Sequence, residues 1–338
     1  MKAYKQLASL FFLLFLVSSC NEENDNPYKV LYGRAQGTTY SIKYISEEDY
    51  LVSQTQIDSI FEAFDASLST YKPNSIISKI NNGDSTVVVD ALFRMVYDAS
   101  EKIFYETNGL FDPTVAPLVN AYGFGPSENI QSLSQKELDS VRLFVGLNKT
   151  QITDDSIMQK AFKATKFDFN AIAQGYTVDI IVDFLVSKSI KNAIVEVGGE
   201  VRSIGRNEVL DKCWVVGVDH PLQTNPNERE LYTTVMLEDM SLATSGNYRK
   251  VKKDSLTGKY YVHTINPNTG FPHKSNVLSA TVVAPKCIYA DAYATVFMLM
   301  TVDETKLFLE SNPSLNVLLI YQNEEGDLVE FRSPNFPE

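Results

Sequence analysis

The sequence predicts an α+β fold in which helices are interspersed among a larger number of strands. Segments with the alternating pattern of strands dominate the second half of the chain, whereas helical spacing recurs mainly in the first half. Strands and helices do not alternate strictly, as they would in a doubly wound parallel sheet. With 338 residues, 44% of them hydrophobic, the chain is long enough to bury a sizeable core.

The N-terminus has the features of a secretory signal. Lys2 and Lys5 precede an apolar run from Leu7 to Val17, which is too short for a membrane span. The segment Val17-Ser18-Ser19-Cys20 resembles a bacterial lipobox. This resemblance implies that residues 1–19 are removed and that Cys20 becomes the lipidated first residue. An ordinary cleaved signal, with Cys20 at this place by chance, is the alternative.

Residues 20–27 would then form the lipidated Cys and a polar tether, and residues 28–338 a single domain. We therefore expect a protein that is anchored by lipid to a bacterial membrane, on its periplasmic or cell-envelope side. The sequence does not distinguish the inner from the outer membrane.

The charge of the chain argues against nucleic acid as a partner. There are 30 basic and 42 acidic residues, and the net charge is −12. An acidic protein can still bind an anionic nucleotide if a metal ion, backbone amides or local Lys and Arg side chains are present at the site. Besides Cys20, only Cys213 and Cys287 remain, and their apolar surroundings favour buried free thiols over a disulfide or a zinc site.

In the first half, two strands are expected between Tyr28 and Ile45, with a bend at Gln36-Gly37-Thr38-Thr39-Tyr40. Helices are then expected from Ser53 to Leu68, around Ile76–Ile80 and from Asp90 to Thr107. The apolar segment Leu110–Gly125 contains two prolines and cannot be one helix or one strand, so it is expected to be a binding loop. Further along, the pattern predicts a helix over Ser134–Val141, short strands up to Phe169 and a helix from Ala171 to Ser187.

The second half is predicted to be mostly strand. The expected elements are strands at Ala193–Val197, Cys213–Asp219, Leu231–Leu237 and Ser241–Thr244, a pair of strands around Asp254–Gly258, a helix at Asp303–Ser311, and strands at Leu315–Tyr321 and Leu328–Arg332.

A strand followed directly by a helix is predicted over Val277–Met300, the stretch around which the chain is organised. The strand pattern reaches Ala284, and the helical run begins near Ala290. Asp291 and Thr295 are four residues apart and would share a helix face, so both could bind one hard cation. The alternative is that Asp291 caps its own helix while Thr295 bonds to the preceding turn.

Four more segments have unusual composition. Asp168 lies in a turn that opens a helix, where backbone amides are free, although a simple helix cap is the alternative. The paired glycines Gly198-Gly199 allow close approach to a backbone or a flat ligand, or form a β-bulge. His263 precedes a Pro- and Gly-rich turn and could accept a proton, although a lone His is more often structural. The segment Ser245–Arg249 offers small donors and a cation, unless it is a solvated strand edge.

Taken in order, these segments resemble the ApbE-type FAD:protein FMN transferases over nearly all of the mature chain. The motifs are GTTYSI at Gly37–Ile42, LSTYKPNSIISKIN at Leu68–Asn81, GLFDPTVAPLVNAYGFG at Gly109–Gly125, FDFNAIAQGYTVD at Phe167–Asp179, VEVGGE at Val195–Glu200, ATSGNYRK at Ala243–Lys250, VHTINPNTGFP at Val262–Pro272 and ADAYAT at Ala290–Thr295.

The resemblance implies an ApbE-like fold of mixed, mainly antiparallel sheets with flanking helices, and an FAD site in a cleft between lobes. It implies an enzyme that splits FAD at its pyrophosphate, joins FMN through a phosphoester to a Thr or Ser of an acceptor protein and releases AMP. By position in the motifs, Mg²⁺ would be bound by the side chains of Asp291 and Thr295 and by the carbonyls of Ala171 and Ala294. The implied catalytic residues are His263 and Asp291.

The residues that would contact FAD also follow from the resemblance. They are Gln36, Tyr71, Leu110, Phe111, Asp112, Asp168, Gln174 and Ile265. Many members of the family have Met at the position of Gln36 and Lys or Glu at that of Gln174, so this chain departs from the pattern there.

Three other functions are alternatives to this transfer reaction. A metal-dependent FAD pyrophosphatase would let water replace the acceptor hydroxyl and would give free FMN and AMP. A lipoprotein that binds FAD without turnover would not need Asp291, Thr295 and His263 together. A purely structural surface lipoprotein would not need so many polar and Gly-rich loops.

Overall fold

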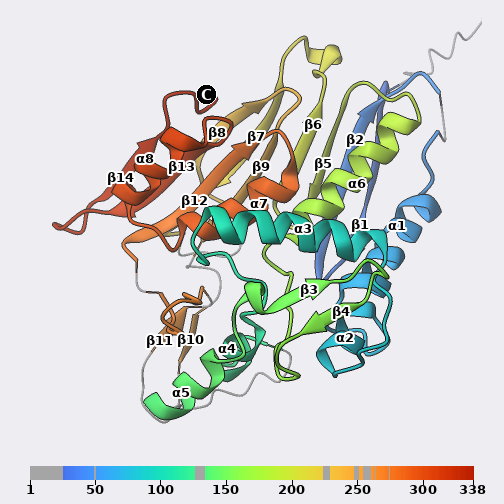
Figure 1. Ribbon diagram of the computed structural model, residues 1–338. Coiled ribbons are helices and arrows are strands. Elements are labelled where there is room, and N and C mark those ends of the chain that lie inside the picture. Colours follow the sequence, from blue (N-terminus) through green and yellow to red (C-terminus); the bar gives the residue numbers. More distant parts are fainter. Residues whose placement is uncertain are drawn as a thin grey trace, which may run out of the picture.

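One large antiparallel sheet forms the centre of the computed structural model, which describes residues 26–48, 51–125, 134–223, 229–246, 251–253, 260–262, 264–273 and 275–338 (Figure 1). Its eight strands all pair in antiparallel fashion with their neighbours. In spatial order they are β1 (Tyr28–Ala35), β2 (Thr38–Ile45), β5 (Ala193–Val197), β6 (Glu200–Ile204), β9 (Ser241–Gly246), β12 (Val277–Ala284), β13 (Asn316–Gln322) and β14 (Leu328–Arg332).

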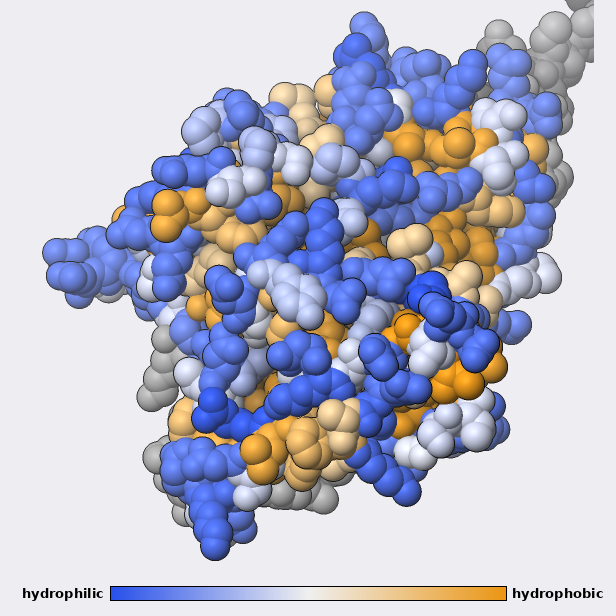
Figure 2. Space-filling model, in the orientation of Figure 1, coloured by the Kyte–Doolittle hydropathy of each residue, from blue (hydrophilic) through white to orange (hydrophobic). Residues whose placement is uncertain are grey.

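Helices cover one face of this sheet (Figure 1). Helix α6 packs on β5 and β6, α7 packs on β9 and β12, and α1 and α3 lie against this pair. The helices are α1 (Gln54–Leu68), α2 (Ile76–Asn81), α3 (Ala91–Glu106), α4 (Ala116–Ala121), α5 (Gln135–Arg142), α6 (Ala173–Ser187), α7 (Cys287–Phe297) and α8 (Val302–Ser311). The helix-covered side of the molecule is mostly hydrophilic at its surface (Figure 2), because the apolar sides of these helices face inward.

Shorter elements complete the fold. The hairpin β7 (Trp214–Asp219) and β8 (Leu231–Leu237) packs on the opposite face of the sheet, where Val218, Val235 and Leu237 join residues of the central strands in one cluster. Two small hairpins lie beyond the helices (Figure 1). They are β3 (Thr150–Ile152) with β4 (Met158–Lys160), and β10 (Val251–Lys253) with β11 (Tyr260–Val262).

Local sequence explains where several helices begin. Ser53 and Gln56 form a capping box at the start of α1, and Thr301 and Glu304 form another at α8. The Asp90 carboxylate accepts a hydrogen bond from the Phe93 N–H and caps α3. Each cap satisfies a backbone donor that has no partner within its helix, so these boundaries agree with the sequence expectation.

Helices α6 and α7 cross at Gly175, where their backbones come into direct contact. A Cβ atom added at Gly175 would lie 2.3 Å from the Cys287 carbonyl oxygen and 2.7 Å from the Asp291 Cβ. Only glycine therefore allows this approach. The crossing brings the first turn of α6 against the stretch of α7 from Cys287 to Asp291, and Thr295 follows one turn later.

The structure corrects three sequence expectations. Helix α7 begins at Cys287 rather than near Ala290. The apolar residues that follow Pro285 and Lys286 already belong to the helix. Strand β6 was not expected, since Arg202 and Ser203 interrupt its apolar pattern. The glycines Gly198 and Gly199, with φ of 65° and 108°, form the two-residue turn of the β5–β6 hairpin and not a β-bulge.

Some sequence expectations fall outside the described residues. These include the signal segment, Cys20 and the turn 254–259, whereas the strand pair expected around that turn is confirmed by the antiparallel pairing of β10 with β11. Where the chain is described, none of its helices combines the length and apolarity needed to cross a bilayer.

We predict that Gly175→Ala destabilises the protein. The new methyl group would collide with backbone of α7, and such overpacking costs about 1–3 kcal/mol of unfolding free energy, which exceeds the small gain in helix propensity. Urea unfolding followed by circular dichroism would measure this. Val186→Ala, at an exposed site of the same helix, is the control and should change stability by less than about 0.5 kcal/mol. Equal stability of both variants would contradict the close crossing.

Candidate active site

A cavity of about 260 Å³ lies where the segment before α6, the side of α7 that carries Asp291 and Thr295, and the loop before α4 meet. Its apolar part is formed by side chains of the loop and of α4, and its polar part by the ends of β6 and β9 and by α7. The lining residues are Leu110, Phe111, Asp112, Pro113, Val115, Val119, Phe124, Asp168, Asn170, Ala171, Glu200, Ser245, Thr264, Ile265, Pro267, Asp291, Thr295 and Leu299.

Asp291 and Asp112 are the two buried carboxylates of this cavity, each 6% exposed. One oxygen of Asp291, Oδ2, accepts a hydrogen bond of 2.9 Å from the Gly175 N–H in the first turn of α6. Asp291 thus caps a neighbouring helix, and the alternative that it caps its own helix is wrong because α7 starts four residues earlier. Burial raises the pKa of Asp291 to about 7, and the Gly175 hydrogen bond opposes this shift.

Thr295 lies one turn after Asp291, and both side chains line the cavity. The Thr295 hydroxyl is 3.3 Å from the Ser245 hydroxyl of β9. Ala171, two residues before α6, lines the same cavity, whereas the buried Ala294 does not. Carboxylate, hydroxyl and carbonyl oxygens are the donors that Mg²⁺ prefers, so these residues fit the cation expected from the sequence.

No group of three or more His, Cys, Asp and Glu side chains that could hold a metal occurs within the described ranges. The expected set does not depend on such a group, because Asp291 is its only carboxylate. A cation here would need the neutral oxygens of Thr295 and of the backbone as well.

The segment from Leu110 to Asp112 forms one wall. Phe111 is buried, and Asp112 accepts hydrogen bonds of 2.8 and 2.6 Å from the backbone N–H and the hydroxyl of Thr114. Burial raises the pKa of Asp112 to about 6, although these hydrogen bonds act in the opposite direction. Asp168 lies next to this wall, and its backbone N–H donates to the Pro113 carbonyl.

Gln36, Tyr71 and Gln174 lie in a second hollow of about 230 Å³, which shares Asn170 with the first cavity. Gln36 donates from Nε2 to the Thr177 hydroxyl, at 2.8 Å. Tyr71 is 69% exposed and therefore forms the rim of this hollow. The structure thus distributes the residues expected to contact FAD over two adjoining spaces, with Ile265 in the first.

His263 is outside the described residues, as are Asn247, Tyr248 and Arg249. Its neighbours Thr264 and Ile265 are described, and both line the first cavity.

The first cavity is acidic. Asp112, Asp168, Glu200 and Asp291 line it, and no Lys, Arg or His is found among its described lining residues. A phosphate-bearing ligand would meet repulsion from these carboxylates unless a cation reversed the local charge.

Glu200 and Ser245 were not among the site residues expected from the sequence. Both lie in segments that were recognised as unusual, directly after Gly198-Gly199 and at the end of β9. Side chains alternate between the two faces of a sheet. This alternation could have placed Glu200 on the helix-covered face if β6 had been recognised as a strand.

This chain is similar to known proteins over most of its length. The profile of the ApbE family matches residues 36–319. The FAD:protein FMN transferase of Vibrio cholerae is 32% identical over 96% of this chain and 95% of its own length, and that of Escherichia coli strain K12 is 31% identical over 91% and 88%. The solved structure of the flavin transferase ApbE from Vibrio cholerae has a TM-score of 0.78 at 31% identity, and covers 91% of this chain and 98% of its own.

We predict that Asp291→Asn is more stable than the wild-type protein in metal-free buffer at pH 8. An Asp with a folded-state pKa of about 7 keeps a proton that the unfolded chain loses near pH 4, so wild-type stability falls as the pH rises between these values. Asn does not titrate, and the difference should reach on the order of 1 kcal/mol or more. Thermal unfolding at pH 4 and pH 8 with a chelator tests this, and a pH-independent difference would contradict it.

Proposed function

Because the chain belongs to the ApbE family of flavin transferases, we propose that it transfers the FMN moiety of FAD to a Thr or Ser hydroxyl of an acceptor protein. The product is a phosphoester, and AMP is released. The observation that supports this reaction is the pairing of an acidic, oxygen-rich end with an apolar wall in one cavity. Such a cavity suits a ligand that combines flat rings with a pyrophosphate bound through a cation.

In this proposal the two hollows hold FAD. Leu110, Phe111 and Ile265 offer apolar surface for a ring, and Gln36 and Gln174 offer amide groups for its polar edge. Tyr71 covers the rim from outside. The depth of the site would exclude much of the surrounding water, which strengthens electrostatic interactions with the pyrophosphate.

Asp291 and Thr295 would bind Mg²⁺ by their side chains, with carbonyl oxygens of Ala171 and Ala294 as further ligands. When bound, the cation neutralises charge that develops on the pyrophosphate oxygens as the phosphorus–oxygen bond breaks. The Gly175 N–H fixes Oδ2 of Asp291, so the carboxylate is held in one orientation. Ser245 orients the Thr295 hydroxyl in the same way.

The transfer step then needs only alignment and one proton acceptor. The acceptor hydroxyl oxygen attacks the phosphorus of the FMN half and forms the new ester bond, while the bond to the bridging oxygen breaks and AMP leaves with both electrons. His263 takes the hydroxyl proton or orients the hydroxyl. The adjacent Thr264 and Ile265 line the cavity, which supports a place for His263 near the reacting atoms.

We also propose that the protein acts at a membrane surface, attached by lipid on Cys20 and facing the periplasm or cell envelope. Residues 1–19 would be the signal peptide, and the domain would begin at residue 28, where β1 starts.

To test the reaction, we would mix the purified protein with FAD, Mg²⁺ and a flavin-acceptor domain with a Thr or Ser site. We expect flavin fluorescence that remains on the acceptor in a denaturing gel and an equal amount of AMP. EDTA should abolish both products. Asp291→Ala should lower the rate by at least about 100-fold, since it removes the only charged ligand, while far-ultraviolet circular dichroism shows an intact fold.

Four results would contradict the proposed reaction or its parts. AMP with free FMN, both with and without the acceptor, would make the protein a pyrophosphatase. Bound FAD without any product would make it a carrier. Transfer by His263→Ala at the wild-type rate would exclude His263 as the proton acceptor, and activity in EDTA would exclude the metal.

The anchoring proposal has its own test. Cys20→Ser should move the protein from the membrane fraction to the soluble fraction of expressing bacteria, because the thiol that would carry lipid is gone. Metabolic labelling with a fatty-acid analogue should mark the wild-type protein alone. Equal labelling of both proteins would exclude Cys20 as the lipidated residue.

A further inference from the structure

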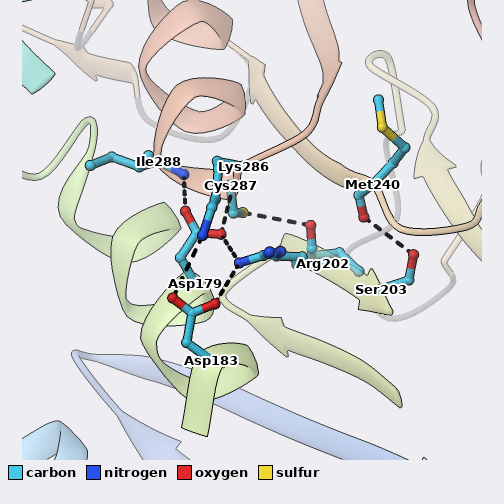
Figure 3. A network of polar contacts seen from close by, with 9 residues as sticks. Asp179, Asp183, Arg202, Ser203, Met240, Lys286, Cys287 and Ile288 are labelled. Carbon is cyan, nitrogen blue, oxygen red and sulfur yellow. Dashed lines mark hydrogen bonds and ion pairs between the residues drawn. The ribbon is translucent and has the colours of Figure 1, made fainter. Parts of the chain in front are cut away.

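A second buried aspartate, Asp179, lies at the crossing of α6 and α7 and does not line the cavity. Its carboxylate accepts hydrogen bonds of 3.0 Å from the backbone N–H groups of Cys287 and Ile288, one on each oxygen (Figure 3). Arg202 of β6 donates to Oδ1 at 2.8 Å. Asp179 is therefore bound simultaneously to the start of α7 and to the central sheet.

Helix α7 depends on this contact for its N-terminal cap. Its own N-cap residue is Lys286, whose side chain makes no capping hydrogen bond. The first N–H groups of a helix have no partner within the helix, and its N-terminus favours negative charge. The Asp179 carboxylate, which projects from α6, satisfies both requirements for Cys287 and Ile288.

The two helices thus exchange carboxylate contacts. Asp179 of α6 accepts from the first turn of α7, and Asp291 of α7 accepts from Gly175 in the first turn of α6. Asp179 lies one turn after Gly175, and Asp291 lies one turn after Cys287. A shift of α7 along α6 would break both contacts together, so the pair defines the register of the helices.

Arg202 fixes the orientation of Asp179 through charge. Its side chain is 13% exposed, and that of Asp179 only 3%. Asp183, one turn later on α6, pairs with the same Arg202 at 3.4 Å and with Lys286 at 3.6 Å, but it is 60% exposed (Figure 3). No hydrogen bond joins Asp183 to the backbone of α7 among the bonds described for it. Asp183 therefore shares the charged partners of Asp179 without the helix contact.

We propose that Asp179 is a positioning residue for the metal site. By holding the first turn of α7, it sets the separation between the two α7 ligands, Asp291 and Thr295, and the Ala171 carbonyl before α6. This inference rests on the proposed function, because it concerns the ligands assigned there. Asp179 itself touches neither metal nor substrate. Residues that orient metal ligands typically change metal affinity by about 10–100-fold when they are replaced.

The test measures binding of Mn²⁺ alone by electron paramagnetic resonance of the free ion, without FAD or acceptor, at a temperature well below thermal unfolding. Asp179→Ala should raise the Mn²⁺ dissociation constant at least about 10-fold. Asp179→Asn keeps one acceptor oxygen for the α7 backbone and should lie between this variant and wild type. Asp183→Ala is the matched control and should bind Mn²⁺ within about two-fold of wild type, because exposed ion pairs contribute little.

The outcomes separate positioning from stability alone. If Asp179→Ala unfolds at a lower temperature but binds Mn²⁺ as tightly as wild type, the positioning role is excluded. If Asp179→Ala does not fold, the Mn²⁺ affinity of Asp179→Asn is compared with that of wild type instead, and equal affinity again excludes the positioning role. Wild-type protein that binds no Mn²⁺ would also overturn the inference. If wild type binds Mn²⁺ but forms neither AMP nor covalent flavin, the proposed function fails, while the comparison of Asp179 and Asp183 variants still decides this inference.

Discussion

The close crossing of α6 and α7 is the constraint on which the rest of the site depends. Gly175 lets the two backbones meet, and the absence of a side chain leaves its N–H free to reach the Asp291 carboxylate. The same crossing brings Ala171 and Thr295 to one cavity. Helix α7 reaches this position because β12 delivers the chain directly into it at the centre of the sheet. Gly175 and Asp291 therefore serve both the packing of the two helices and the geometry of the cavity, so a change that moves the helices also alters the site.

A second physical constraint is the accumulation of negative charge. Four carboxylates line a cavity in a chain whose net charge is −12, and burial keeps Asp291 and Asp112 from ionising easily. Such an arrangement is costly for an empty protein and favourable for one that binds a cation. Functional sites commonly lower the stability of a protein, and binding of the ligand to the folded state then raises it. The acidic end of the cavity is thus better explained by function than by folding.

The sequence was sufficient to predict the α+β class, most helix starts and the family, because caps, periodicity and motifs are local signals. The helix starts at Ser53 and Asp90 were expected from the neighbouring residues alone. By contrast, the cap of α7 comes from Asp179, more than a hundred residues away, and no local pattern indicates it. Glu200 and Ser245 were missed for a related reason, because their side chains reach the site only through strand pairing. Glu200 lies on β6, whose pattern is too polar to be recognised as a strand, and Ser245 lies one residue beyond the strand expected at Ser241–Thr244.

The first residue of α7 gives this protein a built-in chemical reporter. Cys287 is completely buried, its free thiol lies 3.5 Å from the Val201 carbonyl, and burial raises its pKa well above the ordinary value. An alkylating reagent can reach this sulfur only when α7 separates from α6 and β6, since thiolate and access are both required for reaction. The rate at which Cys287 is alkylated therefore reports how often the crossing of α6 and α7 opens transiently. Partly accessible Cys213 would supply the internal reference for reagent strength in the same sample.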